Sequence, residues 1–213
     1  MIDRRRIAGV AVVVVLLVAG GGPRSGGRVR ADTLDSLPDA VLLAVRDVAW
    51  DPGRPNTTVG WCGEASIQMA LRYHGIEQTQ DAIHRAGNPD HDDLYAYEID
   101  PALDALGVCF VAWPEGETTV DRFVDWIRAH LAGGVPALCG VKLHPDGNPD
   151  WTLDHFVLVV GYDRTGLVMN TQLDMDGQIL VSYEELVSIE SAYAFANRWN
   201  IFFGRAILGP CRE

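Results

Sequence analysis

The chain has 213 residues, and its 17 basic and 29 acidic side chains give a net charge of −12. A surface this acidic repels phosphate backbones and anionic lipids, so we expect neither nucleic acid nor an acidic membrane as a partner. Hydrophobic residues make up 48% of the chain. That content is enough for one compact domain after an N-terminal targeting segment is set aside.

The N-terminal segment has the features of a signal peptide. Three arginines at 4–6 precede an apolar run at 7–20, which is shorter than the roughly 20 residues of a membrane span. The sequence Val-Arg-Ala at 29–31 offers an A-x-A-like cleavage site. We therefore expect residues 1–31 to be a signal peptide, the mature protein to be secreted or periplasmic, and no stable membrane association after cleavage. A retained N-terminal membrane anchor is the alternative.

The mature chain is expected to form one domain. Removal of residues 1–31 takes away six arginines and one aspartate, which leaves 11 basic and 28 acidic residues and a net charge near −17. Residues 32–55 read as an entry segment, in which VLLAVRDVAW at 41–50 could pair as an edge strand. Residues 56–213 contain the expected domain.

The first strong helix is CGEASIQMALRYHG at 62–75. Apolar or partly apolar side chains recur at i, i+3, i+4 and i+7 from Ile67, and Gly75 suits the position after the helix end. Cys62 therefore lies at the N-terminal end of a helix, where unpaired N–H groups and the helix dipole favour a thiolate.

The elements that follow change in character along the chain. We expect a short helix at 80–86 and a third helix at 100–107, with Asp100 as cap and Pro101 in the first position. A strand at 108–113 and a fourth helix at 118–134 should follow. Apolar, β-branched runs then predict strands at 135–143, 155–163, 166–172 and 199–208, and Ser182 with Glu185 predicts a capping box. Helices followed by an antiparallel sheet indicate an α+β domain.

Cys62, His155 and Asn170 occur in the order of a nucleophile, a base and a residue that orients the base. The turn at 163–166 predicts a hairpin that brings His155 and Asn170 side by side at its open end. Alternatively, Cys62 is a buried apolar thiol and His155 is a histidine of the core. Asp154 or Asp163 could also be the orienting group in place of Asn170.

The backbone N–H of Cys62 and the side chain of Asn56 could bind a developing oxyanion, although Asn56 could equally be a turn residue. The acidic run at 90–100 lacks the spacing of a known calcium loop, so we expect a solvated loop, no metal and no cofactor. With Cys62 reserved for catalysis, the other three cysteines allow one disulfide and one spare thiol, and the pairing stays open among Cys109, Cys139 and Cys211.

Two segments resemble a known family. WCGEASIQMALRYHG at 61–75 resembles the nucleophile helix of papain-like cysteine peptidases, and is closest to the bacteriocin-processing (double-glycine leader) peptidases and their secreted relatives. HFVLVVGYDRTGLVMN at 155–170 resembles the histidine strand and hairpin of that family. The resemblance implies a papain-like α+β fold, with Cys62 as nucleophile, His155 as base and Asn170 as orienting residue.

The chain departs from the family pattern at three positions. Asn56 stands where Gln is usual, Asn170-Thr171 where Asp-Pro is usual, and Glu64 where a small residue or Pro is usual.

Together the residues and the resemblance predict a secreted cysteine hydrolase that cleaves peptide or isopeptide bonds of a peptide or protein substrate through an acyl-enzyme on Cys62. An acyltransferase with the same triad, or an inactive papain-like domain that binds a peptide or partner, is the alternative.

Overall fold

The computed structural model describes residues 37–50, 60–87, 90, 92–114, 116, 119–145, 150–173 and 177–211. All of them belong to the second of two compact units, Leu34–Glu213. The predicted signal peptide and Asn56 lie outside the described residues. The helices are α1 (Cys62–Tyr73), α2 (Gln80–Gly87), α3 (Ala96–Ala105), α4 (Val120–Ala132) and α5 (Tyr183–Leu186). The strands are β1 (Val41–Leu42), β2 (Val108–Ala112), β3 (Ala137–Val141), β4 (His155–Tyr162), β5 (Gly166–Asn170), β6 (Gln178–Ser182) and β7 (Gly204–Pro210).

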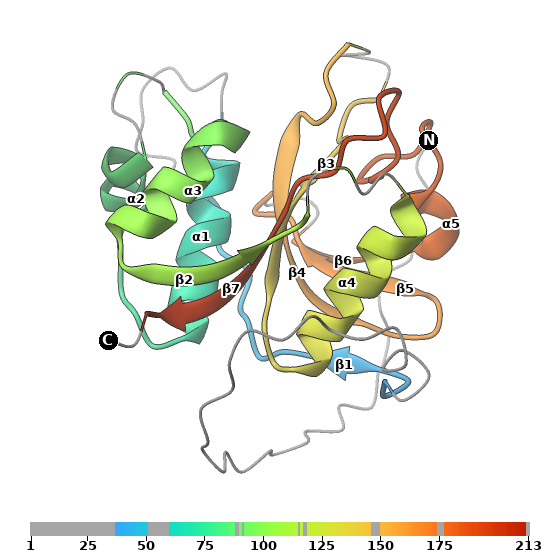
Figure 1. Cartoon of the computed structure of the whole chain (residues 1–213), viewed down its shortest axis with the longest axis horizontal. Coiled ribbons are helices and arrows are strands. Elements are labelled where there is room, and N and C mark those ends of the chain that lie inside the picture. Colours follow the sequence, from blue (N-terminus) through green and yellow to red (C-terminus); the bar gives the residue numbers. More distant parts are fainter. Residues whose placement is uncertain are drawn as a thin grey trace. The chain divides into compact units, whose positions relative to one another are not determined.

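The strands form one antiparallel sheet in the order β2-β7-β3-β4-β5-β6, and β1 pairs with β4 (Figure 1). The turn at 163–166 joins β4 and β5, as predicted, and the N–H of Asp163 donates to the Gly166 carbonyl. The sequence did not indicate β6, and the expected edge strand at 41–50 is reduced to the two residues of β1.

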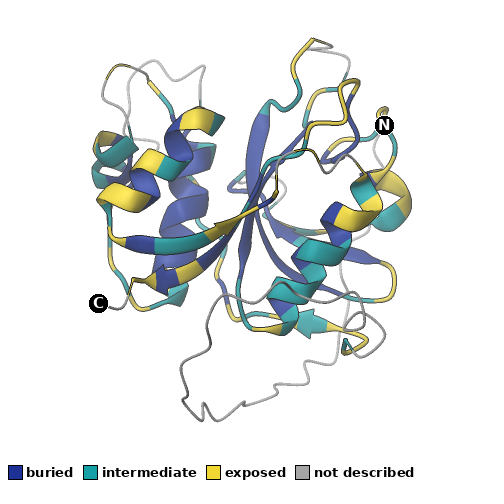
Figure 2. Ribbon diagram, in the orientation of Figure 1, coloured by how far each residue is buried: buried dark blue, intermediate teal, exposed yellow. Residues whose placement is uncertain are grey.

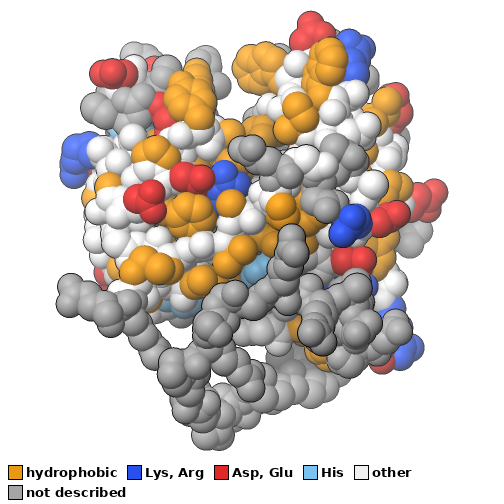
Figure 3. Space-filling model, viewed as in Figure 1, with side chains coloured by type: hydrophobic (Ala, Val, Ile, Leu, Met, Phe, Trp, Pro, Cys, Tyr) orange, Lys and Arg blue, Asp and Glu red, His pale blue; other side chains and the backbone are white. Residues whose placement is uncertain are grey.

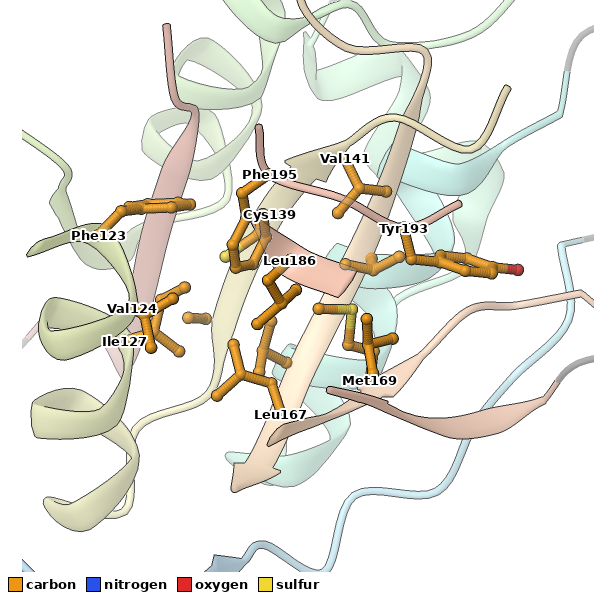
Figure 4. Packing of buried hydrophobic residues seen from close by; sticks show 14 of the residues in the cluster. Phe123, Val124, Ile127, Cys139, Val141, Leu167, Met169, Leu186, Tyr193 and Phe195 are labelled. Carbon is orange, nitrogen blue, oxygen red and sulfur yellow. The ribbon is translucent and has the colours of Figure 1, made fainter. Parts of the chain in front are cut away.

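Helices cover both faces of the sheet. The side chains of β4 alternate between the two core clusters: Phe156 and Leu158 pack with α1, while Val157 and Val159 pack with α4. Every residue of β4 is buried, and Figure 2 shows this strand dark blue along its length. The cluster on the α4 side contains aromatic and aliphatic side chains from α4, β3, β5 and α5 (Figure 4). The central strand is therefore held from both sides.

The start predicted for the third helix is wrong. Instead of Asp100, Tyr95 occupies the cap position of α3, and the Glu98 carboxylate accepts from the Tyr95 N–H at 2.9 Å. This contact closes a helical turn before Pro101, which lies inside the helix. The predicted C-terminal ends of the first and third helices are confirmed. Gly75 after α1 and Gly107 after α3 have φ angles of 76° and 66°, a left-handed conformation that glycine adopts readily.

The four cysteines divide into one disulfide and two thiols. Cys109 at β2 is bonded to Cys211, which follows β7, whereas Cys62 and the buried Cys139 are free. No helix among the described residues is long and apolar enough to cross a membrane.

Candidate active site

The thiol of Cys62 lies at the first residue of α1, as the sequence predicted. Trp61 occupies the cap position, and its carbonyl accepts from Ala65 in the first turn. The backbone N–H groups of Phe156 and Gly63 donate to the sulfur. Phe156 directly follows His155, so the nucleophile of the sequence prediction lies against the first residues of β4.

Burial raises the pKa of the Cys62 thiol to about 12. The N–H groups of Phe156 and Gly63 oppose that shift, while the negative charges of Glu64 and Asp93 add to it. The thiol is therefore protonated at neutral pH, and a nucleophilic reaction requires a base that removes its proton.

His155 is held in one tautomer. The residue is 3% exposed, and its Nε2 lies 3.1 Å from the carbonyl oxygen of Thr171. A carbonyl oxygen only accepts, so Nε2 carries the hydrogen, and in the neutral ring the lone pair is on Nδ1. The ring also meets Tyr193 edge-on, with 6.3 Å between centroids. A fixed ring with a basic Nδ1 is what a general base requires.

The register of the hairpin differs from the expected side-by-side arrangement of His155 and Asn170. Asn170 pairs with Leu158, and an irregularity between Val159 and Gly161 shifts the pairing by one residue. A shift of one residue moves a side chain to the other face of the sheet. Asn170 therefore shares the α1 face with Leu158, and Thr171 comes to the face of His155.

The contacts of Asn170 lie on that α1 face. Its Nδ2 donates to the Val45 carbonyl at 3.2 Å and lies 3.5 Å from Met69 Sδ, while its Oδ1 accepts from Gln178 at 2.7 Å. The His155 ring donates through Nε2 to the carbonyl of the neighbouring residue, Thr171. The orienting role of Asn170 stays a prediction, as does the oxyanion role of Asn56.

The other candidate carboxylates have different partners. Asp163 accepts from the backbone of the hairpin turn at Thr165 and Gly166. Asp154 forms a buried ion pair with Lys142, 3.2 Å between Oδ2 and Nζ, and also accepts from the N–H of Leu143. This pair fixes the segment that leads into β4 directly before the histidine.

A second buried pair, for which the sequence contains no local signal, adjoins the thiol. Glu64 Oε1 lies 2.9 Å from His84 Nδ1 and accepts from the Leu94 N–H at 3.0 Å. Trp61 stacks on the His84 ring and donates to the Asp92 carbonyl at 2.5 Å. Together these contacts hold the acidic segment before α3 beside the start of α1. Among the described residues, no group of three or more His, Cys, Asp or Glu side chains could hold a metal ion.

The sequence profile of the Peptidase_C39-like family matches residues 43–207. The chain belongs to this family. The matched range contains Cys62, His155 and Asn170, and the predicted papain-like cysteine peptidase relationship is confirmed.

Solved structures agree on the fold. A protein from Bacillus anthracis described as a C39-like peptidase is 15% identical, with a TM-score of 0.57 over 82% of this chain and 100% of that one. The peptidase domain of Streptococcus ComA, a bifunctional ABC transporter in a quorum-sensing pathway, is 14% identical, with a TM-score of 0.52 over 78% and 99%. Xylellain, a cysteine protease from Xylella fastidiosa, is 16% identical, with a TM-score of 0.52 over 86% and 90%.

Identities this low establish the fold alone, which is the predicted α+β papain-like fold with the nucleophile helix packed on an antiparallel sheet. No curated protein matches the chain in sequence.

Proposed function

We propose that this chain is an exported thiol peptidase of the Peptidase_C39-like family that hydrolyses peptide or isopeptide bonds through an acyl-enzyme on Cys62. The observation that carries the proposal is the position of the sulfur, which accepts from the N–H of the residue after His155. The hydrogen bond of Nε2 to the Thr171 carbonyl adds to it, because this bond makes Nδ1 the basic nitrogen. Residues 1–31 would direct export.

The reaction would begin when Cys62 Sγ attacks the substrate carbonyl carbon and its proton passes to His155 Nδ1. The carbonyl oxygen becomes an oxyanion, for which the N–H of Cys62 at the start of α1 is a donor. Collapse of the tetrahedral intermediate breaks the C–N bond, and the imidazolium protonates the leaving amine. Water then gives a proton to His155 and hydrolyses the thioester, which restores the thiol.

The surroundings of the thiol favour an extended substrate with apolar and basic side chains. α1 and β4 both begin at the top of the view in Figure 1. Figure 3 shows a hollow there, with hydrophobic side chains over α3 on one side and over the segment between β3 and β4 on the other. Tyr97 and Trp151, from these two segments, are exposed. The charge of Asp93 reaches the thiol and would attract a basic side chain.

One observation favours an alternative function. A thiol with a pKa of about 12 is a poor nucleophile until a base acts on it, as expected for an inactive domain that binds a peptide or partner. Transfer of the acyl group to an amine instead of water would be a third outcome of the same chemistry.

The proposed function is tested by measuring cleavage of a large peptide library by the purified protein. We expect cleavage by the unchanged chain, no cleavage by Cys62→Ala or His155→Ala, and a mass increase on the peptide containing Cys62 when the acyl-enzyme is trapped by acid. Loss of activity by about 10³-fold or more is typical when a nucleophile is removed.

Cys139→Ala is the matched control, since it removes the other free thiol at a buried position in β3. Peptide binding without cleavage by the unchanged chain would establish the inactive domain instead. Amide products formed with an added amine would establish the transferase.

A further inference from the structure

The peptide group between Thr171 and Gln172 lies between His155 and a carboxylate from the start of the domain. Its carbonyl oxygen is 3.1 Å from His155 Nε2, and its N–H donates to Asp47 Oδ1 at 3.2 Å. Thr171 and Gln172 are 0% and 1% exposed. A peptide group is planar and rigid, so one buried unit joins the ring to Asp47.

The side chain of Gln172 fixes this peptide group from one end. The residue has a φ of 61°, in the left-handed region that non-glycine residues seldom adopt. Its Nε2 donates to Ser66 Oγ at 2.7 Å and to the Asn170 carbonyl at 3.2 Å. Ser66 lies in α1 four residues after Cys62, so these contacts tie the peptide group to the helix that carries the thiol.

Thr171 fixes the peptide group from the other end. Its N–H and its Oγ1 both donate to the carbonyl of Gly177, at 3.0 and 2.7 Å. The carbonyl of Thr171 cannot turn away from the histidine ring without also turning the Gln172 N–H away from Asp47, because both belong to the same peptide group. The left-handed conformation of Gln172 costs backbone energy, and several hydrogen bonds maintain it. Strain that is maintained in this way indicates a functional constraint and not only a reversal of the chain direction.

Hydrogen bonds in a chain polarise one another. A carboxylate that accepts from the N–H of a peptide group increases the negative charge on the carbonyl oxygen of that group. Negative charge beside an imidazole favours its protonated form. The charge of Asp47 therefore acts on His155 through the Thr171–Gln172 peptide group.

We propose that Asp47 is a positioning residue for His155. It holds and polarises the Thr171–Gln172 peptide group, which keeps Nδ1 of His155 the basic nitrogen and stabilises the imidazolium formed when Cys62 loses its proton. The inference rests on the proposed function, since it assigns a role in the same reaction.

Other titratable groups among the described residues lie near the start of β4. Tyr193 meets the ring edge-on, the Cys62 sulfur accepts from the N–H of the next residue, Phe156, and the Lys142–Asp154 ion pair immediately precedes the ring. These contacts do not involve Asp47, whose carboxylate accepts from the Gln172 N–H.

Asp47→Asn is the decisive variant, because it keeps an oxygen acceptor for the Gln172 N–H and removes the charge. We expect kcat to fall about three- to tenfold with KM little changed, since the residue stabilises the imidazolium and not the bound substrate. The acid limb of the pH–rate profile should move to lower pH by about half a unit or more, because the neutral ring is the general base and that limb reports loss of the imidazolium proton.

Asp47→Glu, which retains the charge, should restore part of both effects. Asp39→Asn is the control, because Asp39 lies in the same segment but forms an exposed pair with Arg164. Equal profiles for Asp47→Asn and the unchanged chain would overturn the inference.

A measurement by NMR separates this inference from the proposed function. In a Cys62→Ser background, Asp47→Asn should lower the titration midpoint of the His155 ring, with or without peptidase activity. In the chain with Asp47 intact, the Gln172 amide resonance should titrate with the same midpoint as the ring, and this decides the matter if Asp47→Asn does not fold. A shift of the His155 titration midpoint without peptide cleavage would refute the proposed peptidase function and leave the effect of Asp47 on the ring standing. Peptide cleavage without such a shift would refute the role of Asp47.

Discussion

Single residues around Cys62 shift the pKa of its thiol in opposite directions. Burial is the largest influence on its pKa and raises it, as do the charges of Glu64 and Asp93, while two backbone N–H groups lower it. The burial and the N–H donors belong to the position of the thiol at the start of α1 and cannot be removed by one substitution. The carboxylates can, so they offer the direct test of the electrostatics.

Asp93→Asn should lower the pKa of Cys62, because it removes a negative charge that opposes the thiolate. At a pH below that pKa the thiolate fraction rises in proportion, so we expect alkylation of Cys62 near pH 8 to accelerate about two- to fivefold. Alkylation is followed by mass spectrometry of the peptide that contains Cys62. The same substitution at Asp121, in the first turn of α4, should leave the rate unchanged. Equal rates for both variants would count against the electrostatic assignment.

Elements were predictable from sequence where the signal is local. Gly75 has the left-handed φ that ends α1, and Ser182 and Glu185 form the predicted capping box. The face of Asn170 could not be predicted, because it depends on one extra residue in β4. Gly161 was the available sign: a Cβ there would lie 2.5 Å from the Val41 carbonyl, and glycine inside a strand marks a bulge or a close backbone approach.

The start of α3 shows the same limit in a helix. An Asp-Pro pair is a good start signal, yet Glu98 closes a turn onto Tyr95 one turn earlier. Within the candidate site, the position of Cys62 at the start of its helix was predictable, because the sequence of one segment determines it. The roles of Thr171, Gln172 and Asp47 depend on contacts between segments that are distant in sequence, which no local pattern encodes.

The disulfide between Cys109 and Cys211 should stabilise the pairing of β2 with β7. It closes a loop with a sequence separation of 102, so removal of both sulfurs should cost about 2–4 kcal/mol of unfolding free energy. Urea denaturation of a Cys109→Ser, Cys211→Ser double variant measures this. A reductant should destabilise the unchanged chain by a similar amount and leave the double variant unaffected. The same midpoint for both chains without reductant would contradict the prediction.

The charge of the whole molecule bears on the substrate. With a net charge of −12, and near −17 without residues 1–31, the protein should attract basic peptides over a distance that salt shortens. We expect kcat/KM for a basic peptide to fall several-fold between about 0.02 and 0.5 M salt, and that for a matched neutral peptide to change little. Steady-state kinetics at a series of salt concentrations is the measurement. Parallel curves for the two peptides would mean that the acidic surface plays no part in selection.

Lys142 is the only lysine in the chain, and its side chain is 5% exposed in the ion pair with Asp154. The proposed acyl-enzyme on Cys62 would therefore meet no accessible lysine amine on another copy of the same protein. The lysine side chain of the protein would be a poor acceptor for any acyl group that the thiol carries. Copies at high concentration should stay unmodified at lysine and free of isopeptide cross-links to one another.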